Sequence, residues 1–254
     1  MQILYPSRLS YHWHQIEQTI RQYHDTNNPD DVLLLGSYIE NDIDEFRKLY
    51  PNSKIIIFQT EPLLSKNHCW TPEYLLNKIK KVDEVWDYDF QNVLYLKQHG
   101  INAVFKPLCL YTKSHDHIIT VDDPPIDVLF YGSATEHRLE YIRTITKSNL
   151  SFVFVSMLDG PALDELISKS KVIVNIHQNK NQQQEQTRIT YLLSNGKCVI
   201  SEKSPVNYYG DTIIELEGMI KIYRKCFDYS RGGYWKEMAE QSKIKFQQFN
   251  TEIL

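Results

Sequence analysis

The sequence alternates short apolar runs with amphipathic segments along most of its length. The runs Val32 to Leu35, Lys54 to Phe58 and Val172 to Val174 are each too short for a helix and end at turn-forming or polar residues, which indicates buried strands. The segments between them carry apolar residues at the spacing of one helical face. Strands and helices that alternate in this way favour a mostly parallel sheet covered by helices. The sequence therefore predicts an α/β fold.

The alternation is interrupted once, between Tyr111 and Pro125. Two aspartates and two prolines, Asp122 to Pro125, end this mixed polar stretch, which is typical of a linker. The strand and helix pattern then restarts at residue 127. We expect an N-terminal domain over residues 1–112, a linker over 113–125, a second domain over 126–233 and a C-terminal helix over 234–254. Two such α/β domains would form a cleft where the carboxyl edges of their sheets meet, and clefts of this kind favour ligand binding.

Composition excludes several classes of protein. A net charge of −4 over 254 residues argues against a non-specific nucleic-acid partner. The four cysteines are widely spaced without a CxxC pair, which favours a reducing compartment over a disulfide framework. The N-terminus lacks the basic start and apolar core of a signal peptide. No apolar run approaches the roughly 18 residues of a membrane span. We therefore expect a cytoplasmic protein with no membrane span.

The stretch from Lys171 to Glu202 contains the best candidate for an active edge. It reads as a buried strand, a polar loop with three consecutive glutamines, a helix and a second strand over Cys198 to Ile200. Asn195 and Gly196 end the helix, as glycine after a helix end often does. Polar residues gather at the carboxyl end of the first strand and at the start of the helix. Ligands of open α/β sheets bind at that edge, and a helix N-terminus favours anions.

Four segments together carry a resemblance to a known group of enzymes. They read VIVNIH…EQTRITYLLSNGKCVISE, IDVLFYGSATEHRLEYI, IIIFQTEPL and DEVWDYDFQNVLYLKQHGI. In their order and spacing they resemble the two-domain glycosyltransferases of the GT-B architecture, and they look closest to the family 1-like branch that includes the CgeB-type proteins. The resemblance implies two Rossmann-like domains with parallel sheets that face each other across a cleft. It also implies a C-terminal helix that crosses back to the first domain, and no metal or other cofactor.

The same resemblance implies that the second domain holds a nucleotide-diphospho-sugar while the first holds the acceptor. Gly132 and Ser133 follow a predicted strand and could let a diphosphate approach the backbone. Arg138 and Arg188 are candidates to clamp the diphosphate, because a guanidinium offers paired donors to phosphate oxygens. The alternative for Arg188 is a surface pair with Glu185 three residues before it. The alternative for Arg138 is an exposed helix face.

Two further residues are candidates for donor binding. Glu185 could accept hydrogen bonds from donor hydroxyls, or could only stabilise the helix dipole from the first turn. His177 follows a buried strand and could touch the sugar or a phosphate, or could be a satisfied histidine at a loop. Many relatives carry a glutamate that binds the ribose where this chain has Tyr191, so Glu185 or Glu202 would have to replace it.

The candidates for a catalytic base lie in the first half of the chain. His12 and His14 fall in the predicted loop after the first strand, and an imidazole can take a proton from a hydroxyl near neutral pH. Glu61 at the carboxyl end of a later strand is the competing carboxylate, and Asp87 is similarly placed. The pairs His12 with His14, and His115 with His117, lack a third ligand at metal spacing. We therefore predict no metal site.

The sequence leads to one functional hypothesis and two alternatives. The hypothesis is a metal-independent hexosyl- or pentosyltransferase that moves a sugar from a UDP- or GDP-sugar to a hydroxyl of a glycan or other acceptor. The first alternative is a non-catalytic binding or assembly protein with the same fold, which the tyrosine at position 191 motivates. The second is an NAD-dependent enzyme, but neither residues 2–5 nor residues 127–131 are followed by GxGxxG, the usual dinucleotide signature.

Overall fold

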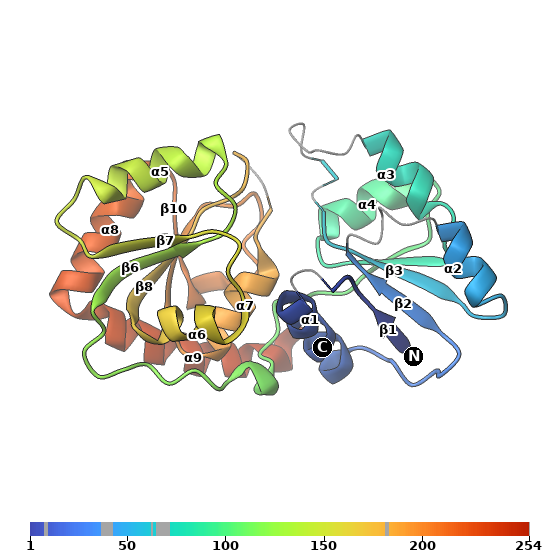
Figure 1. Ribbon diagram of the computed structural model, residues 1–254, viewed down its shortest axis with the longest axis horizontal. Coiled ribbons are helices and arrows are strands. Elements are labelled where there is room, and N and C mark those ends of the chain that lie inside the picture. The colour runs from blue at the N-terminus through green and yellow to red at the C-terminus, as the bar shows by residue number, and fades with distance from the viewer. Residues whose placement is uncertain (8–9, 37–42, 62, 65–71, 181–182, 254) are drawn as a thin grey trace. The chain divides into compact units, whose positions relative to one another are not determined.

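The computed structural model describes residues 1–7, 10–36, 43–61, 63–64, 72–180 and 183–253. These residues form two compact units, Met1–Leu108 and Cys109–Leu254, and each contains its own five-stranded parallel sheet with helices on both faces (Figure 1). The predicted parallel α/β fold is confirmed for both halves of the chain.

The first unit is built on a sheet with the strand order β1-β2-β3-β4-β5. Its strands are β1 (Gln2–Leu4), β2 (Val32–Leu35), β3 (Ile55–Gln59), β4 (Glu84–Asp87) and β5 (Ala103–Phe105), and its helices are α1 (Ser10–Tyr23), α2 (Ile43–Leu49), α3 (Pro72–Ile79) and α4 (Phe90–Gln98). Successive side chains of a strand point to opposite faces of the sheet. In β2, Leu33 and Leu35 accordingly pack with the buried face of α1, whereas Val32 and Leu34 pack with α2, α3 and α4.

The second unit has the strand order β10-β9-β8-β6-β7. Its strands are β6 (Ile126–Tyr131), β7 (Phe152–Val155), β8 (Ser170–Asn175), β9 (Cys198–Glu202) and β10 (Ile214–Leu216), and its α-helices are α5 (Glu136–Thr146), α6 (Gly160–Ser168), α7 (Gln186–Ser194), α8 (Met219–Gly232) and α9 (Tyr234–Ile253). Two 3₁₀ turns, η2 (Lys113–His115) and η3 (Gly210–Thr212), complete it. Helices α5 and α6 lie on opposite faces of the sheet (Figure 1).

The segment that the sequence suggested as a linker belongs to the second unit. The side-chain oxygen of Asn195 accepts hydrogen bonds from the backbone of His117 at 3.1 Å and of Ile118 at 2.7 Å. Further along, Lys197 Nζ donates to the hydroxyl of Thr120 at 2.6 Å. Asn195 therefore ends α7, as expected, and also anchors the residues that enter the second unit.

The C-terminal helix α9 packs against α7, α8, β8 and β9 of its own unit. The crossing of this helix to the first domain stays a prediction. Among the described residues, none of the helices has both the length and the apolar character that a membrane crossing requires.

Candidate functional site

The order in which the chain adds strands to the second sheet reverses between β6 and β8. From β6 the chain first continues to β7 on one side, and later returns to β8, β9 and β10 on the other side. The carboxyl ends of two strands at such a point leave a crevice, which is where open α/β sheets bind ligands. Gly132 and Ser133 follow β6, His177 lies two residues beyond β8, and Arg188 lies in the first turn of α7. The strand order therefore brings the predicted donor residues to one place.

Arg138 ties the two strand ends together. It lies in the first turn of α5 and is only 3% exposed. Its Nη1 donates to Ser133 Oγ at 2.9 Å and its Nε donates to the carbonyl of Ile176 at 2.9 Å. Its Nη2 donates to Glu185 Oε1 at 2.7 Å. Burial lowers the pKa of Arg138 to about 10, against the opposing effect of Glu185, so the guanidinium stays charged at neutral pH.

Glu185 is the carboxylate around which the basic groups collect. Burial alone would raise its pKa, but Arg188, His177 and Arg138 outweigh burial and lower it to about 2. The residue stands at the N-cap position of α7, yet its side chain makes no capping hydrogen bond there. Glu185 is therefore ionised at neutral pH and directed at the basic side chains rather than at the helix end. We call Gly132, Ser133, Arg138, His177, Glu185 and Arg188 the arginine cluster.

Arg188 completes the cluster from α7. Its Nη1 donates to Asn175 Oδ1 at 2.7 Å and lies 3.6 Å from Glu185 Oε2. The guanidinium carbon lies 5.0 Å from the centre of the Tyr131 ring, a cation–π distance. The side chain is 14% exposed, so Arg188 is not the solvated surface pair that its spacing from Glu185 alone would allow.

Gly132 lies against the tips of both arginines. A Cβ at this position would lie 3.0 Å from Arg188 Nη2 and 3.2 Å from Arg138 Nη1, and the backbone has φ +143°. Both observations favour glycine, because a side chain would crowd the guanidinium groups and L-residues rarely adopt such a φ. The missing side chain lets two positive charges approach the end of β6.

His177 supports the cluster from inside the protein and has no exposed surface. Its Nδ1 lies 3.4 Å from Glu185 Oε2, and its Nε2 hydrogen-bonds with Ser204 Oγ at 3.1 Å. Burial lowers the pKa of His177, but Glu185 and then Glu202 raise it by more, so the net shift is upward. The structure thus uses His177 to link Glu185 to the end of β9.

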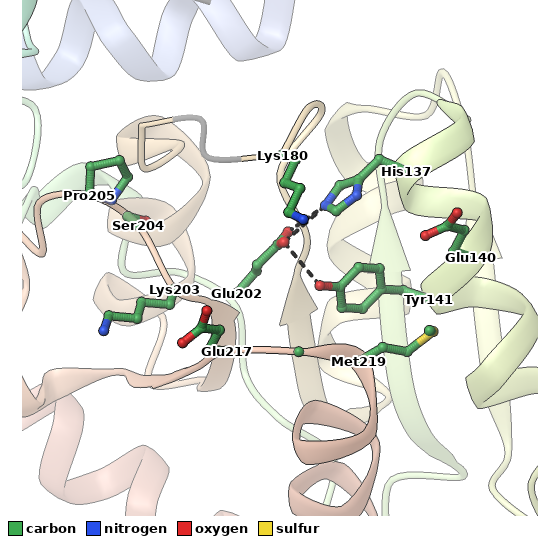
Figure 2. Close-up of a pocket in the computed structure, with 11 residues that line it drawn as sticks. His137, Glu140, Tyr141, Lys180, Glu202, Lys203, Ser204, Pro205, Glu217 and Met219 are labelled. Carbon is green, nitrogen blue, oxygen red and sulfur yellow. Dashed lines mark hydrogen bonds and ion pairs between the residues drawn. The ribbon is translucent and has the colours of Figure 1, made fainter.

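A second set of side chains, which the sequence did not single out, surrounds Glu202. His137 Nε2 lies 2.9 Å and 3.0 Å from the two carboxylate oxygens of Glu202, and the hydroxyl of Tyr141 donates to Oε1 at 2.9 Å. Figure 2 shows the carboxylate between the two rings. His137 and Tyr141 are four residues apart and so share one face of α5. This spacing was the available signal, but the acid that pairs with them comes from a distant strand.

Tyr191 has a structural role on another side of α7. It is 2% exposed, and its hydroxyl donates to Asp164 Oδ1 at 2.6 Å and lies 3.2 Å from His117 Nε2. The position that the sequence resemblance assigns to a ribose-binding glutamate therefore holds α6 and the segment around residue 117 in this chain.

The proposed bases of the first unit are placed differently from the expectation. His12 and His14 do not lie in a loop, because α1 begins at Ser10. The helix starts early because Trp13, Ile16 and Ile20 form a buried stripe against the sheet. The His12 ring is 5.2 Å from the ring of Trp13, and the exposed His14 has Nδ1 3.5 Å from Glu17 Oε2.

The two carboxylate candidates of the first unit lie at the carboxyl ends of adjacent strands, with Asp87 as the last residue of β4. Glu61 is half-buried just beyond β3, and its carbonyl accepts a hydrogen bond from Asn92 Nδ2 at 3.1 Å. The same nitrogen donates to Asp87 Oδ2 at 3.0 Å, and the backbone of Asp89 donates to Oδ1 at 2.7 Å. Burial raises the pKa of Asp87 well above its usual value. The role of Glu61 and of the two histidines stays a prediction. Over the described residues, no group of three or more His, Cys, Asp or Glu is arranged to hold a metal ion.

Comparison with solved structures identifies the fold. The crystal structure of TarM superposes with a TM-score of 0.61 at 8% identity and covers 92% of this chain and 55% of that chain. An S. aureus TarM mutant in complex with Fondaparinux, alpha-GlcNAc-glycerol and UDP gives a TM-score of 0.61 at 10% identity, with 94% and 56% covered. The N-terminal domain of Candida albicans trehalose-6-phosphate phosphatase gives 0.57 at 10% identity, with 94% and 74% covered.

These similarities establish a two-domain fold of Rossmann-like units of the GT-B type. The chain spans little more than half the length of the TarM structures, at 55% and 56%. No protein-family model matches the sequence, and no curated protein is similar enough to match it.

Proposed function

We propose that this protein is a cytoplasmic glycosyltransferase that moves a sugar from a UDP- or GDP-sugar to a hydroxyl of a glycan or other acceptor, without a metal ion. The arginine cluster is the observation that supports this proposal. It gathers two guanidinium groups against a glycine at the switch point of a GT-B fold. The family 1-like, CgeB-type branch remains our choice within that fold because of the four segments quoted above.

The charge of the cluster suits a diphosphate. Arg138 and Arg188 contribute two positive charges and Glu185 one negative charge, so the set keeps an excess positive charge before His177 is considered. The first turns of α5 and α7 both adjoin the crevice, and helix N-termini favour anions. These features are what a nucleoside diphosphate needs from a protein that uses no metal.

The two arginines would have different roles. Arg138 is buried and all three of its nitrogens donate within the protein, so it positions Ser133 and Glu185. Arg188 is partly exposed and has its Nη2 beside Gly132, so it is the group that would touch the diphosphate. During transfer the bond between the anomeric carbon and the diphosphate breaks, and its electron pair stays on the diphosphate. Arg188 would stabilise the negative charge that develops there.

The acceptor hydroxyl must lose its proton as its oxygen attacks the anomeric carbon. If the reaction inverts the anomeric configuration, a base of the first unit would take that proton, and His12, His14 and Glu61 are the candidates. If it retains the configuration, a dedicated base is less necessary. The TarM mutant structure that shares this fold contains UDP, which supports a nucleotide as one ligand here.

The alternative is a non-catalytic protein of the same fold. The contacts of Tyr191 favour it. The resemblance implies a ribose-binding glutamate at this position, but this chain has a tyrosine there, which contacts Asp164 and His117. Such a protein would bind a nucleotide without cleaving a nucleotide-sugar, so binding and turnover have to be measured separately.

Binding is tested by thermal shift with UDP, GDP, CDP, ADP and dTDP, each with Mg²⁺ and with EDTA. A ligand at a hundredfold excess over Kd stabilises the folded state by about 2.7 kcal/mol. We expect a shift with one nucleoside diphosphate, equal with Mg²⁺ and with EDTA. The shift should be lost in Arg188→Ala and kept in Arg224→Ala, which removes an exposed arginine of α8. A folded wild-type protein that responds to none of the five would overturn the proposal.

A further inference from the structure

A cavity of about 500 Å³ opens beside the arginine cluster in the second unit. Its walls come from α5, the loop after β8, the loop after β9 and the start of α8 (Figure 2). Its volume is in the range of small-molecule sites. The side chains that matter here are those of His137, Tyr141, Lys180, Glu202, Lys203 and Ser204. We call this cavity the α5–β9 pocket.

The pocket contains an imidazole whose tautomer is fixed. Glu202 as a carboxylate only accepts hydrogen bonds, so the Nε2 of His137, at 2.9 Å and 3.0 Å from its two oxygens, must carry a proton. The Nδ1 of the neutral ring is then an acceptor. Within the part of the chain that the structure describes, Nδ1 receives no hydrogen bond, and the side chain is 18% exposed. An acceptor is therefore available at the pocket wall.

Glu202 itself is largely occupied. Tyr141 and His137 donate to Oε1, while His137 and the backbone N–H of His177 donate to Oε2, the latter at 3.1 Å. The carboxylate thus acts mainly as the support that orients the ring of His137. In this arrangement His137 is the residue that would contact a ligand, and Glu202 is a positioning residue.

The α5–β9 pocket and the arginine cluster share a wall. Ser204 lines the pocket and hydrogen-bonds with the Nε2 of His177, whose Nδ1 faces Glu185 of the cluster. If the diphosphate of a ligand lies at Gly132 and Arg188, one of the groups bonded to that diphosphate would lie near this wall. The charged and polar rim, with Lys180 and Lys203 on it, suits a hydroxylated ring better than an apolar group.

We propose that the α5–β9 pocket receives a hydroxyl-bearing ring of the donor, and that His137 Nδ1 accepts a hydrogen bond from one of its hydroxyl groups. This inference rests on the proposed function. Two parts of a nucleotide-sugar present this chemistry, the ribose and the transferred sugar. Both carry neighbouring hydroxyl groups, and the experiment has to separate them.

The decisive variant is His137→Gln. Its side-chain amide can still donate to Glu202 from about the position of Nε2, but it places no acceptor at the position of Nδ1. Affinities are measured by calorimetry for the nucleoside diphosphate that the thermal-shift panel selects, for its 2′,3′-dideoxy analogue, and for the corresponding nucleotide-glucose. His99→Gln, which changes an exposed histidine at the end of α4, is the matched control. We expect affinity to fall about five- to tenfold in His137→Gln, the effect of one lost hydrogen bond, and to be unchanged in the control.

The ligands distinguish the outcomes. If the fall occurs with the nucleoside diphosphate and vanishes with the dideoxy analogue, the pocket binds the ribose. If it occurs only with the nucleotide-glucose, the pocket binds the transferred sugar. The wild type could bind these ligands, with affinities that fall in Arg188→Ala but stay unchanged in His137→Gln. In that case the pocket inference is wrong while the proposed function stands. If wild type binds no nucleotide, both are overturned.

Discussion

Glu185 balances the charges of the arginine cluster, because it is the carboxylate nearest to Arg138, Arg188 and His177. Its pKa is about 2, well below the usual 4.5. The cluster was predictable from the sequence as a set of residues, since each follows a strand or begins a helix at a carboxyl edge. The partners were not predictable. From the sequence, Arg138 was also consistent with an exposed helix face. Its hydrogen bonds to Ile176 and Glu185, which lie 38 and 47 positions away, hold its side chain inside the protein.

Stability at low pH should depend on Glu185. A folded-state pKa below the unfolded value means that its stabilisation is present above about pH 4.5 and is lost as the pH falls toward 2. The shift corresponds to about 3 kcal/mol. In urea unfolding we expect Glu185→Gln to be less stable than wild type by about 2–3 kcal/mol at pH 7. The difference should be smaller at pH 3, and an equal difference at both values would contradict the pairing.

Lys197 is a buried lysine at the other end of α7, and its replacement should stabilise the protein. The residue is 2% exposed, its Nζ contacts Thr120, and burial lowers its pKa from 10.5 to about 7. The unfolded chain therefore binds the proton more strongly between pH 7 and 10.5, and stability falls as the pH falls through this window.

We expect Lys197→Met to raise the unfolding free energy at pH 7 by about 2 kcal/mol, since a buried charge is replaced by an apolar group of similar length. The gain should shrink toward pH 10, where wild type is no longer penalised. Urea unfolding at both pH values measures it, and a Met variant that is less stable than wild type at pH 7 would show that the bond to Thr120 outweighs burial.

The strand ends and helix starts of the second unit show what local patterns can and cannot predict. Strand and helix periodicity gave the order of elements and the parallel sheets. It did not reveal that residues 113–125 belong to the second unit, because Asn195 binds His117 and Ile118 across 78 and 77 residues of sequence. It also missed His137 and Tyr141, because Glu202 reaches them only through the adjacency of β6, β8 and β9.

A side chain at Gly132, in the turn after β6, would both strain the backbone and crowd the two arginines. Gly132→Ala should reduce stability by about 1–2 kcal/mol and also weaken nucleoside diphosphate binding, because the new Cβ meets both arginines as well as an unfavourable φ. Gly210→Ala is the matched control, with φ +56° and no heavy atom within 4 Å of its Cβ. The control should lose stability alone. Equal nucleotide affinity in the two variants would exclude a role for the Gly132 turn in binding.

At the level of the whole chain, the fold is that of GT-B proteins, and the arginine cluster lies at the switch point of the second sheet, where open α/β sheets bind ligands. In the first unit, Glu61 and Asp87 lie at the carboxyl edge of the sheet, and α1 carries His12 and His14. The sequence resemblance pointed to this architecture although identity to the superposed structures is only 8–10%.

The central claim is sugar transfer without a metal ion, and turnover tests it most directly. Purified protein is incubated with UDP- and GDP-sugars in EDTA, and the release of nucleoside diphosphate is followed over hours, with wild type, Arg188→Ala and Arg224→Ala in parallel. We predict slow release from one donor class by wild type and by Arg224→Ala, unchanged when Mg²⁺ replaces EDTA, and at least about 100-fold slower in Arg188→Ala. Tight binding of a nucleotide with no release from any nucleotide-sugar, with or without Mg²⁺ and candidate acceptors, would contradict the account and identify a non-catalytic protein of this fold.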